Sequence, residues 1–224
     1  MKNNSNRAPD EKGSIYVRGH IKISDVTDKT KPIILCNKSN AIHFENISSA
    51  LAYGLANKGQ NYIYEMRFGN GGSSVDPTGV ITYLPPNTNT QNSNLYNPTY
   101  SKIVDDTAIA NSDPTRNYIE VRHVPGELYT DILVSCLLDY GEPAGQAAFD
   151  NSQTLDQAYV FDELGLVGRD STTGATDSLV NNVFTSDAGP LLTHVIFHPV
   201  QKSLNRLIQI DYTVRIQTLT MLTA

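Results

Sequence analysis

The chain contains no tryptophan, only two cysteines and few charged residues. Asp, Glu, Lys and Arg make up 18% of its 224 residues, against roughly 25% in average soluble domains. The net charge is -6, and no lysine- or arginine-rich run follows the N-terminal segment. Because nucleic-acid binding relies on clustered basic side chains at the phosphates, the composition argues against specific recognition of DNA or RNA.

Long hydrophobic runs are also missing. The longest apolar runs fall well short of the roughly 20 residues that a membrane span needs, so no membrane association is expected. Cys36 and Cys136 lie in the apolar runs PIILC and DILVSCLLDY, where cysteine behaves as a small buried hydrophobe. The N-terminus, MKNNSNRAPDEKGS, lacks the apolar region of a signal peptide. We expect residues 1–14 to form a flexible arm and residues 15–224 to form a single β-rich domain.

Alternating or short apolar runs, which are typical of strands, recur along the chain. They cover residues 14–24, 32–36, 62–68, 80–84, 117–124, 128–140, 158–167, 191–199 and 206–219, with a weaker run at 179–184. They favour a mainly β (α+β) fold, a β-sandwich or barrel-like domain with one amphipathic α-helix and long polar loops. Gly19 stands where the alternation calls for an apolar residue, so we expect a bulge there.

One segment has the periodicity of an amphipathic helix. Its apolar residues recur at spacings of three and four and share one face: Phe44, Ile47, Leu51 and Leu55. Ser39 or Asn40 is expected to cap the start of this helix. Gly59 is expected to end it in the left-handed conformation.

Two polar segments separate the predicted strands. The loop GNGGSSVDPTG, residues 69–79, lacks both the Lys-Ser/Thr pair of a nucleotide-binding loop and the GxGxxG order. Its glycines are expected to permit tight turns or close approach by a neighbouring chain. Residues 85–117 form a long insertion, with a possible helical piece at 100–110. We expect deletion of residues 87–97 to leave the fold intact but to impair assembly.

No catalytic, cofactor-binding or metal-binding residue is assigned, no cofactor is expected, and the chain is interpreted as a non-enzyme. His194 and His198 have H-x3-H spacing, but on a strand they lie about 13 Å apart, at roughly 3.3 Å per residue. They are interpreted as surface or interface histidines. Asp162 and Glu163 are adjacent on a predicted strand, so their side chains should point to opposite faces, one toward solvent and one pairing or capping.

Several whole segments resemble virion structural proteins of contractile-tailed bacteriophages. They are AIHFENISSALAYGLAN, YEMRFGNGGSSVDPTGVITYLPPNT, LYNPTYSKIVDD, YVFDELGLVG and HVIFHPVQKSLNRLIQIDYTVRIQT, and together they cover most of residues 36–219. The similarity is greatest to neck or collar proteins, which join the head to the tail. The resemblance implies a cyclic homo-oligomer that contacts the portal or adaptor above and the tail terminator below, and that leaves a channel for DNA.

The same resemblance implies a location in the neck or tail region of the virion, after synthesis in the cytoplasm of the host bacterium. A baseplate, tail-fibre-attachment or head-decoration protein of the same virion is the alternative, and it predicts trimers or isolated copies instead of a closed ring. A carbohydrate-active enzyme using Asp162 or Glu163, or a carbohydrate-binding module, is disfavoured because tryptophan is absent.

Overall fold

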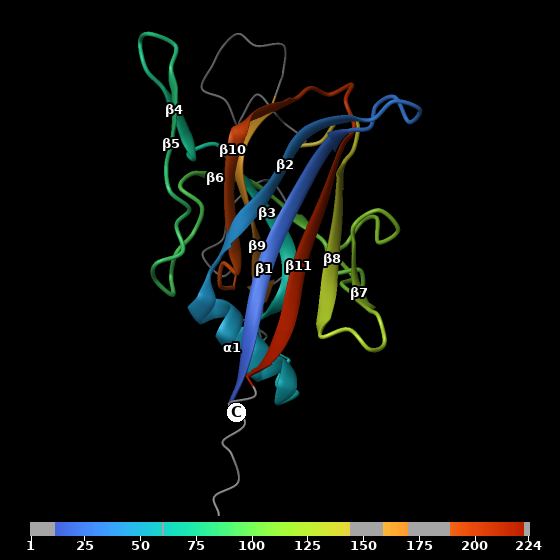
Figure 1. Ribbon diagram of the computed structural model, residues 1–224. Coiled ribbons are helices and arrows are strands. Elements are labelled where there is room, and N and C mark those ends of the chain that lie inside the picture. The colour runs from blue at the N-terminus through green and yellow to red at the C-terminus, as the bar shows by residue number, and fades with distance from the viewer. Residues whose placement is uncertain (1–11, 60, 144–158, 170–188, 222–224) are drawn as a thin grey trace, which may run out of the picture.

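The computed structural model describes residues 12–59, 61–143, 159–169 and 189–221. In this part of the chain the fold is mostly β with a single helix, which confirms the predicted fold class. Nine strands form one antiparallel sheet that curls into a half-barrel (Figure 1). The elements are β1 (Lys12–Asp25), β2 (Ile33–Ile42), α1 (Phe44–Leu55), β3 (Tyr62–Gly69), β4 (Ser73–Val75), β5 (Ile81–Tyr83), β6 (Pro98–Ile103), β7 (Tyr118–His123), β8 (Tyr129–Leu138), β9 (Tyr159–Arg169), β10 (Thr193–Lys202) and β11 (Ile208–Met221).

The order of strands across the sheet is β6-β3-β9-β10-β2-β1-β11-β8-β7, and β4 and β5 form a separate hairpin. The last five strands of this order are called the long leaf, and the first four the short leaf. The long leaf follows the period-2 pattern seen in the sequence. Ile21 pairs with Tyr212, and Ile23 with Ile210, so the apolar side chains of paired strands share one face. That face forms the core, and the opposite face carries most of the polar residues.

The short leaf supplies the aromatic half of the core. Phe68 of β3 meets Phe161 of β9 edge-on, with ring centroids 5.3 Å apart. Phe161 in turn contacts Phe197 of β10 at 5.7 Å. Almost every residue of β9 is buried, because one face of this strand covers the core and the loops that follow β3 cover the other.

The two leaves join through very few strand contacts. β10 pairs with β2 at only two positions, Thr193 with Ile42 and His194 with Ala41. Beyond this point the strands separate, and Lys38 Nζ donates a hydrogen bond to Ile196 O at 2.8 Å. The two leaves therefore meet over the core at this junction. The amine of Lys38 supplies a hydrogen bond to the carbonyl oxygen of Ile196, which has no strand partner on β2.

Helix α1 follows β2 directly, and its cap differs from the prediction. His43 is the N-cap, and its Nδ1 accepts a hydrogen bond from Asn46 N at 3.2 Å. Ser39 and Asn40 are still within β2, because that strand continues past the predicted end. The predicted end is also wrong: the helix ends at Leu55 with Ala56 as its C-cap, and Asn57, with a φ of 53°, takes the left-handed position directly after the cap. Gly59 has a positive φ of 60°, but it lies in the loop beyond.

The apolar face of α1 is only partly covered. Ile47 and the half-buried Leu51 pack against the sheet. In contrast, Phe44 and Leu55 at the two ends of the helix are 73% and 88% exposed. The predicted helical face is therefore correct as a pattern, but the chain buries only its middle.

Three local predictions are wrong. Residues 12–14 belong to β1 and not to an arm, and residues 98–103 form strand β6 instead of a helical piece. The pairing of β1 is regular at Gly19, where no bulge occurs. A Cβ at Gly19 would lie 1.7 Å from Asn40 Oδ1, so glycine leaves room for a cross-strand side chain. The predicted arm up to residue 11 and the weak strand at 179–184 lie outside the described residues.

Candidate functional site

The side chains of Asp162 and Glu163 do not point to opposite faces with one in solvent, contrary to the sequence-based expectation. Both are buried, at 3% and 0% exposure, and both accept hydrogen bonds from backbone N–H groups of the glycine-rich loop. Asp162 Oδ1 accepts from Gly72 N at 3.0 Å, and its Oδ2 accepts from Ser73 N at 2.8 Å. Glu163 Oε1 accepts from Gly71 N at 3.1 Å. A shift in the register between β9 and β10 lies beside this pair, where regular alternation is lost.

Glu163 also holds the next loop. Its Oε1 accepts from Asn97 N at 2.8 Å, and its Oε2 accepts from Tyr96 N at 2.9 Å. His194 Nε2 donates to the same Oε2 at 3.0 Å, and His194 Nδ1 accepts from Asn87 N at 2.8 Å. The imidazole is therefore neutral, with its proton on Nε2. The interpretation of His194 as a surface histidine is wrong, because this residue is fully buried.

The electrostatics of the two carboxylates differ. Burial alone raises the pKa of Glu163, but hydrogen bonds from His194 and from three backbone N–H groups outweigh it and hold the pKa below its usual value. At Asp162 burial prevails over the bonds from Ser73 and Gly72, and the pKa is raised. Glu163 is thus an ionised carboxylate that accepts four hydrogen bonds from the chain itself, and it anchors the loops that donate them.

The glycines of the loop allow this close approach. A Cβ at Gly69 would lie 2.5 Å from Glu163 Oε1, and one at Gly72 would lie 2.9 Å from Ile196 Cγ2. The glycines do permit close approach, but at these positions it comes from the same chain, and approach by a neighbouring chain stays a prediction. Residues 87–97 are likewise bonded to Glu163 and His194 at both ends, so deleting them would strip donors from two buried polar groups, and the expectation that the fold tolerates this deletion is not supported.

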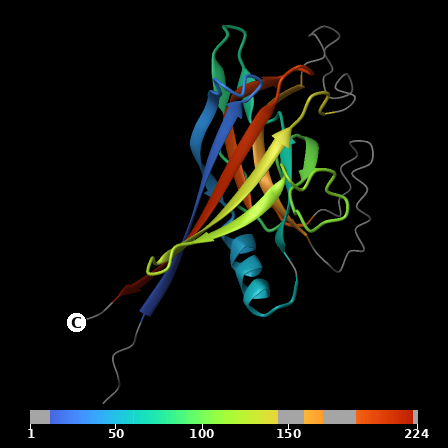
Figure 2. The ribbon, with the colours of Figure 1, turned by 90° about the vertical axis from the view of Figure 1, so that its right-hand side faces the viewer.

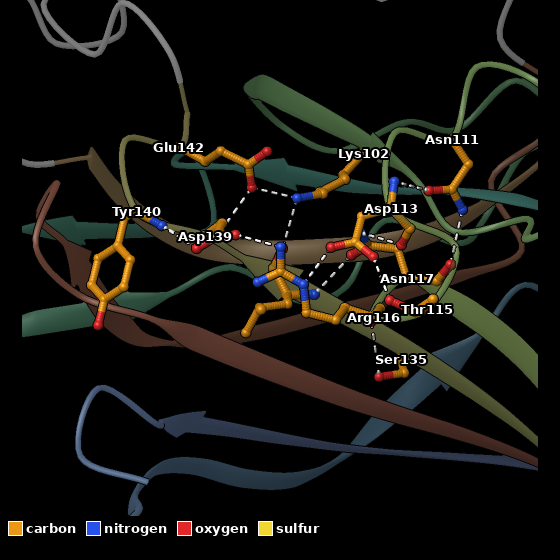
Figure 3. A network of polar contacts seen from close by, with 11 residues as sticks. Lys102, Asn111, Asp113, Thr115, Arg116, Asn117, Ser135, Asp139, Tyr140 and Glu142 are labelled. Atoms are coloured by element: carbon orange, nitrogen blue, oxygen red, sulfur yellow. Dashed lines mark hydrogen bonds and ion pairs between the residues drawn. The ribbon is translucent and has the colours of Figure 1, made fainter.

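A second polar network fixes residues 105–117 (Figure 3). Lys102 Nζ donates to Leu137 O at 2.7 Å and forms an ion pair with Glu142. Arg116 pairs with Asp139 at 2.6 Å. The network therefore ties β6, the loop before β7 and the end of β8 to one another.

Asn117 is the buried centre of this second network (Figure 3). Its Oδ1 accepts from Leu137 N at 2.9 Å, and its Nδ2 donates to Asp113 O at 3.1 Å. Asn111 Nδ2 donates to the backbone oxygen of Asn117 at 2.8 Å. Both polar networks have their hydrogen-bonding capacity used within the chain, so we assign them to the positioning of loops.

An apolar cleft of about 430 Å³ lies between α1 and the long leaf. On the sheet side, Val17 pairs with Ile216 and Val214 pairs with Ile132, so their side chains continue the core-facing surface of the long leaf. The helix contributes Ile47, Ala50 and Leu51, and the rim includes Asp105, Asp106 and Thr107. The long leaf extends past the short leaf here, and among the described strands none forms a second sheet against its inner surface.

Beyond the cleft the long leaf continues, and the ends of β1 and β11 and the turn between β7 and β8 project away from the rest of the sheet (Figure 2). Ile15, Val121, Val124 and Leu128 are 54–67% exposed, and we call these four residues the apolar extension. The turn that carries Val124 and Leu128 is held to β11 by a hydrogen bond from Thr218 N to Leu128 O at 2.9 Å. Chemically, the cleft and the extension suit contact with apolar groups, since contiguous exposed apolar surface commonly marks an interaction site.

The other sequence candidates stay apart from this surface. His198 is exposed and lies 3.2 Å from Tyr83 Oη, with no second histidine beside it. Cys36 and Cys136 are free thiols, and burial raises the pKa of Cys136 to about 12. In the described ranges no group of three metal-binding side chains comes together. The one helix found there is too short to cross a bilayer.

Sequence reasoning missed both the anchor and the cleft for different reasons. The anchor joins residues 66 to 92 positions apart in the chain, and no local pattern reports such a distance. The exposed apolar surface had a signal: the helical face at Phe44 and Leu55 and the strand residues Ile15 and Val121 are all apolar, yet the structure leaves all four exposed.

Comparisons of the chain with protein-family models, with curated proteins and with solved structures give no match.

Proposed function

We propose that this protein is a structural, non-catalytic subunit of a tailed-bacteriophage virion. In this proposal it assembles into an oligomeric ring in the neck or collar, joins head to tail and leaves a channel for DNA. The observation that carries the assembly part is the apolar extension together with the cleft beside it. The assignment to a phage neck rests on the resemblance of the segments between residues 36 and 219.

The physical argument concerns apolar surface left in water. Fully burying one aliphatic side chain contributes roughly 1.5–3 kcal/mol. Each residue of the apolar extension keeps more than half of that surface exposed, so each offers on the order of 1 kcal/mol to a contact. A ring subunit needs two different patches for its two neighbours. The extension supports one patch, and the exposed ends of α1 support a second.

The remaining properties of the chain fit the same role. Its two buried carboxylates accept hydrogen bonds from the backbone of the loops, which favours a role in holding the loops rigid over a role in catalysis. Its net charge of -6 repels DNA, which suits a channel wall better than a binding surface. The proposed partners are further copies of this chain, the portal or adaptor, and the tail terminator.

The test combines mass in solution with a matched pair of variants. The double variant Ile15→Ser/Leu128→Ser removes two residues of the apolar extension, while Ile109→Ser removes a fully exposed residue of another loop. Light scattering and negative-stain images should show rings for the native chain and for Ile109→Ser, and loss of rings for the double variant at unchanged circular dichroism. Rings that survive the double variant would contradict the role of the extension. A discrete trimer would favour the baseplate or fibre-attachment alternative.

A further inference from the structure

The two edges of the nine-stranded sheet are not equivalent. β6, at one edge, begins with Pro98 and has most of its residues buried. β7, at the other edge (Figure 1), is exposed from Glu120 through its last residue. Val121, in the middle of β7, is 67% exposed. Exposed edge strands readily pair with another chain unless proline, charge or a covering loop protects them, and β7 has such an open edge from Glu120 onward.

The direction in which the N–H groups of β7 point follows from one contact at the start of the strand. Ile119 N donates to Asp106 Oδ1 at 3.5 Å, so this N–H points away from β8. Because N–H groups alternate along a strand, those of Val121 and His123 also point to the open edge. Those of Tyr118, Glu120 and Arg122 face β8.

We propose that two copies of this chain pair through β7, antiparallel, about a two-fold axis at Val121. This register places Val121 opposite its own copy as a hydrogen-bonded pair, with Ile119 opposite His123. On the other face it places Glu120 opposite Arg122 twice. The partner is therefore a second copy of the same chain, and the contact is isologous.

The charges on β7 favour this register over the two registers that are shifted by two residues. A shift of two residues in one direction sets Glu120 against its own copy, and a shift in the other direction sets Arg122 against its own copy. Like charges directly opposite each other on paired strands are unfavourable. Within one chain, Arg122 Nη2 already lies 2.7 Å from Glu120 Oε2, so the two residues share a face and the dimer would extend this pair into an alternating group of four charges.

The inference stands on the geometry of the β7 edge and does not depend on the proposed place in a virion. In a ring-forming subunit the same contact would join two rings back to back. In an otherwise monomeric chain it would give a dimer. In both cases, loss of the contact halves the mass of the assembly.

The test uses two charge reversals. Glu120→Arg sets Arg against Arg, and Arg122→Glu sets Glu against Glu, so each variant alone should show half the native mass and a dissociation constant raised by about tenfold or more. Mixing the two variants restores every opposite-charge contact, and the native mass should return. The inference is overturned if either variant keeps the native mass at concentrations where the native chain is assembled, if the mixture stays apart, or if the native chain is itself monomeric.

A covalent test covers the register. Antiparallel hydrogen-bonded pairs have Cα atoms about 5.5 Å apart, which lies within the range of a disulfide. Val121→Cys should therefore cross-link to a dimer under mild oxidation. Val75→Cys, on the β4–β5 hairpin and similarly exposed, is the control and should remain uncross-linked. Equal cross-linking of both variants would contradict the register.

Discussion

Replacement of Glu163 by glutamine tests whether this residue is the anchor of the loops. Its Oε1 accepts from Gly71 N and Asn97 N, and its Oε2 accepts from Tyr96 N and His194 Nε2. The amide of glutamine has one acceptor oxygen and one donor group, so in either orientation two N–H groups face a donor. Each buried unpaired donor costs about 1–3 kcal/mol. Glu163→Gln should therefore lower the free energy of unfolding by about 2–6 kcal/mol.

The histidine cannot remove this cost by changing its tautomer. A proton moved to Nδ1 of His194 would face Asn87 N, which now donates to that atom, so the conflict would only shift to another buried contact. For a domain of this size, a loss of about 2–6 kcal/mol corresponds to a melting temperature lower by roughly 4–24 °C.

Urea denaturation gives the free energy from the midpoint and the slope. Hydrogen exchange at the amides of Gly71, Tyr96 and Asn97 reports whether the loops open locally. Glu127→Gln, on the exposed turn between β7 and β8, is the matched control and should leave the midpoint unchanged. A Glu163→Gln protein as stable as the native chain, with the same amide protection, would refute the reasoning.

Three further changes probe the packing and the second polar network. Gly19→Ala should lower the denaturation midpoint because the added methyl meets the Asn40 side chain, and adding Asn40→Ala should recover part of the loss; purely additive losses would contradict this steric account. Asn117→Ala leaves the Leu137 N–H without its acceptor and should cost about 1–3 kcal/mol in the same assay, and an unchanged midpoint would contradict the role of this side chain. Burial lowers the pKa of Lys202 from its usual 10.5 to about 8, so between these values the unfolded chain binds more protons and this residue makes stability rise with pH. Lys202→Met should remove this contribution, so the free energy of unfolding should rise less between about pH 8 and 10 than it does for the native chain. An unchanged pH dependence would count against the shifted pKa of Lys202.

The sequence was sufficient to predict most of the strands and the helix, because alternation and helical spacing are local properties. Strand β1 shows the limit of that method. Its apolar face predicts a strand correctly, but Gly19 was assigned a bulge because the partner that needs the space, Asn40, is known only once β2 is placed beside it. β6 was missed because its short polar sequence, PTYSKI, has no alternation, and its strand structure depends on pairing with β3.

The site could be predicted less well than the fold. Asp162 and Glu163 were assigned to opposite faces on the assumption of a regular strand, and the register shift beside them removes that condition. The burial of His194 depends on loops that precede it by about a hundred positions in the chain. In contrast, apolar residues that remain exposed after folding, such as Ile15 and Val121, can be recognised only when sequence and structure are considered together.

The mass of the purified chain in solution, measured by light scattering with negative-stain images of the same sample, tests the central claim most directly. The account predicts closed rings, formed by the chain alone or on addition of the portal complex. A chain that stays monomeric at high concentration and in the presence of neck proteins would contradict it.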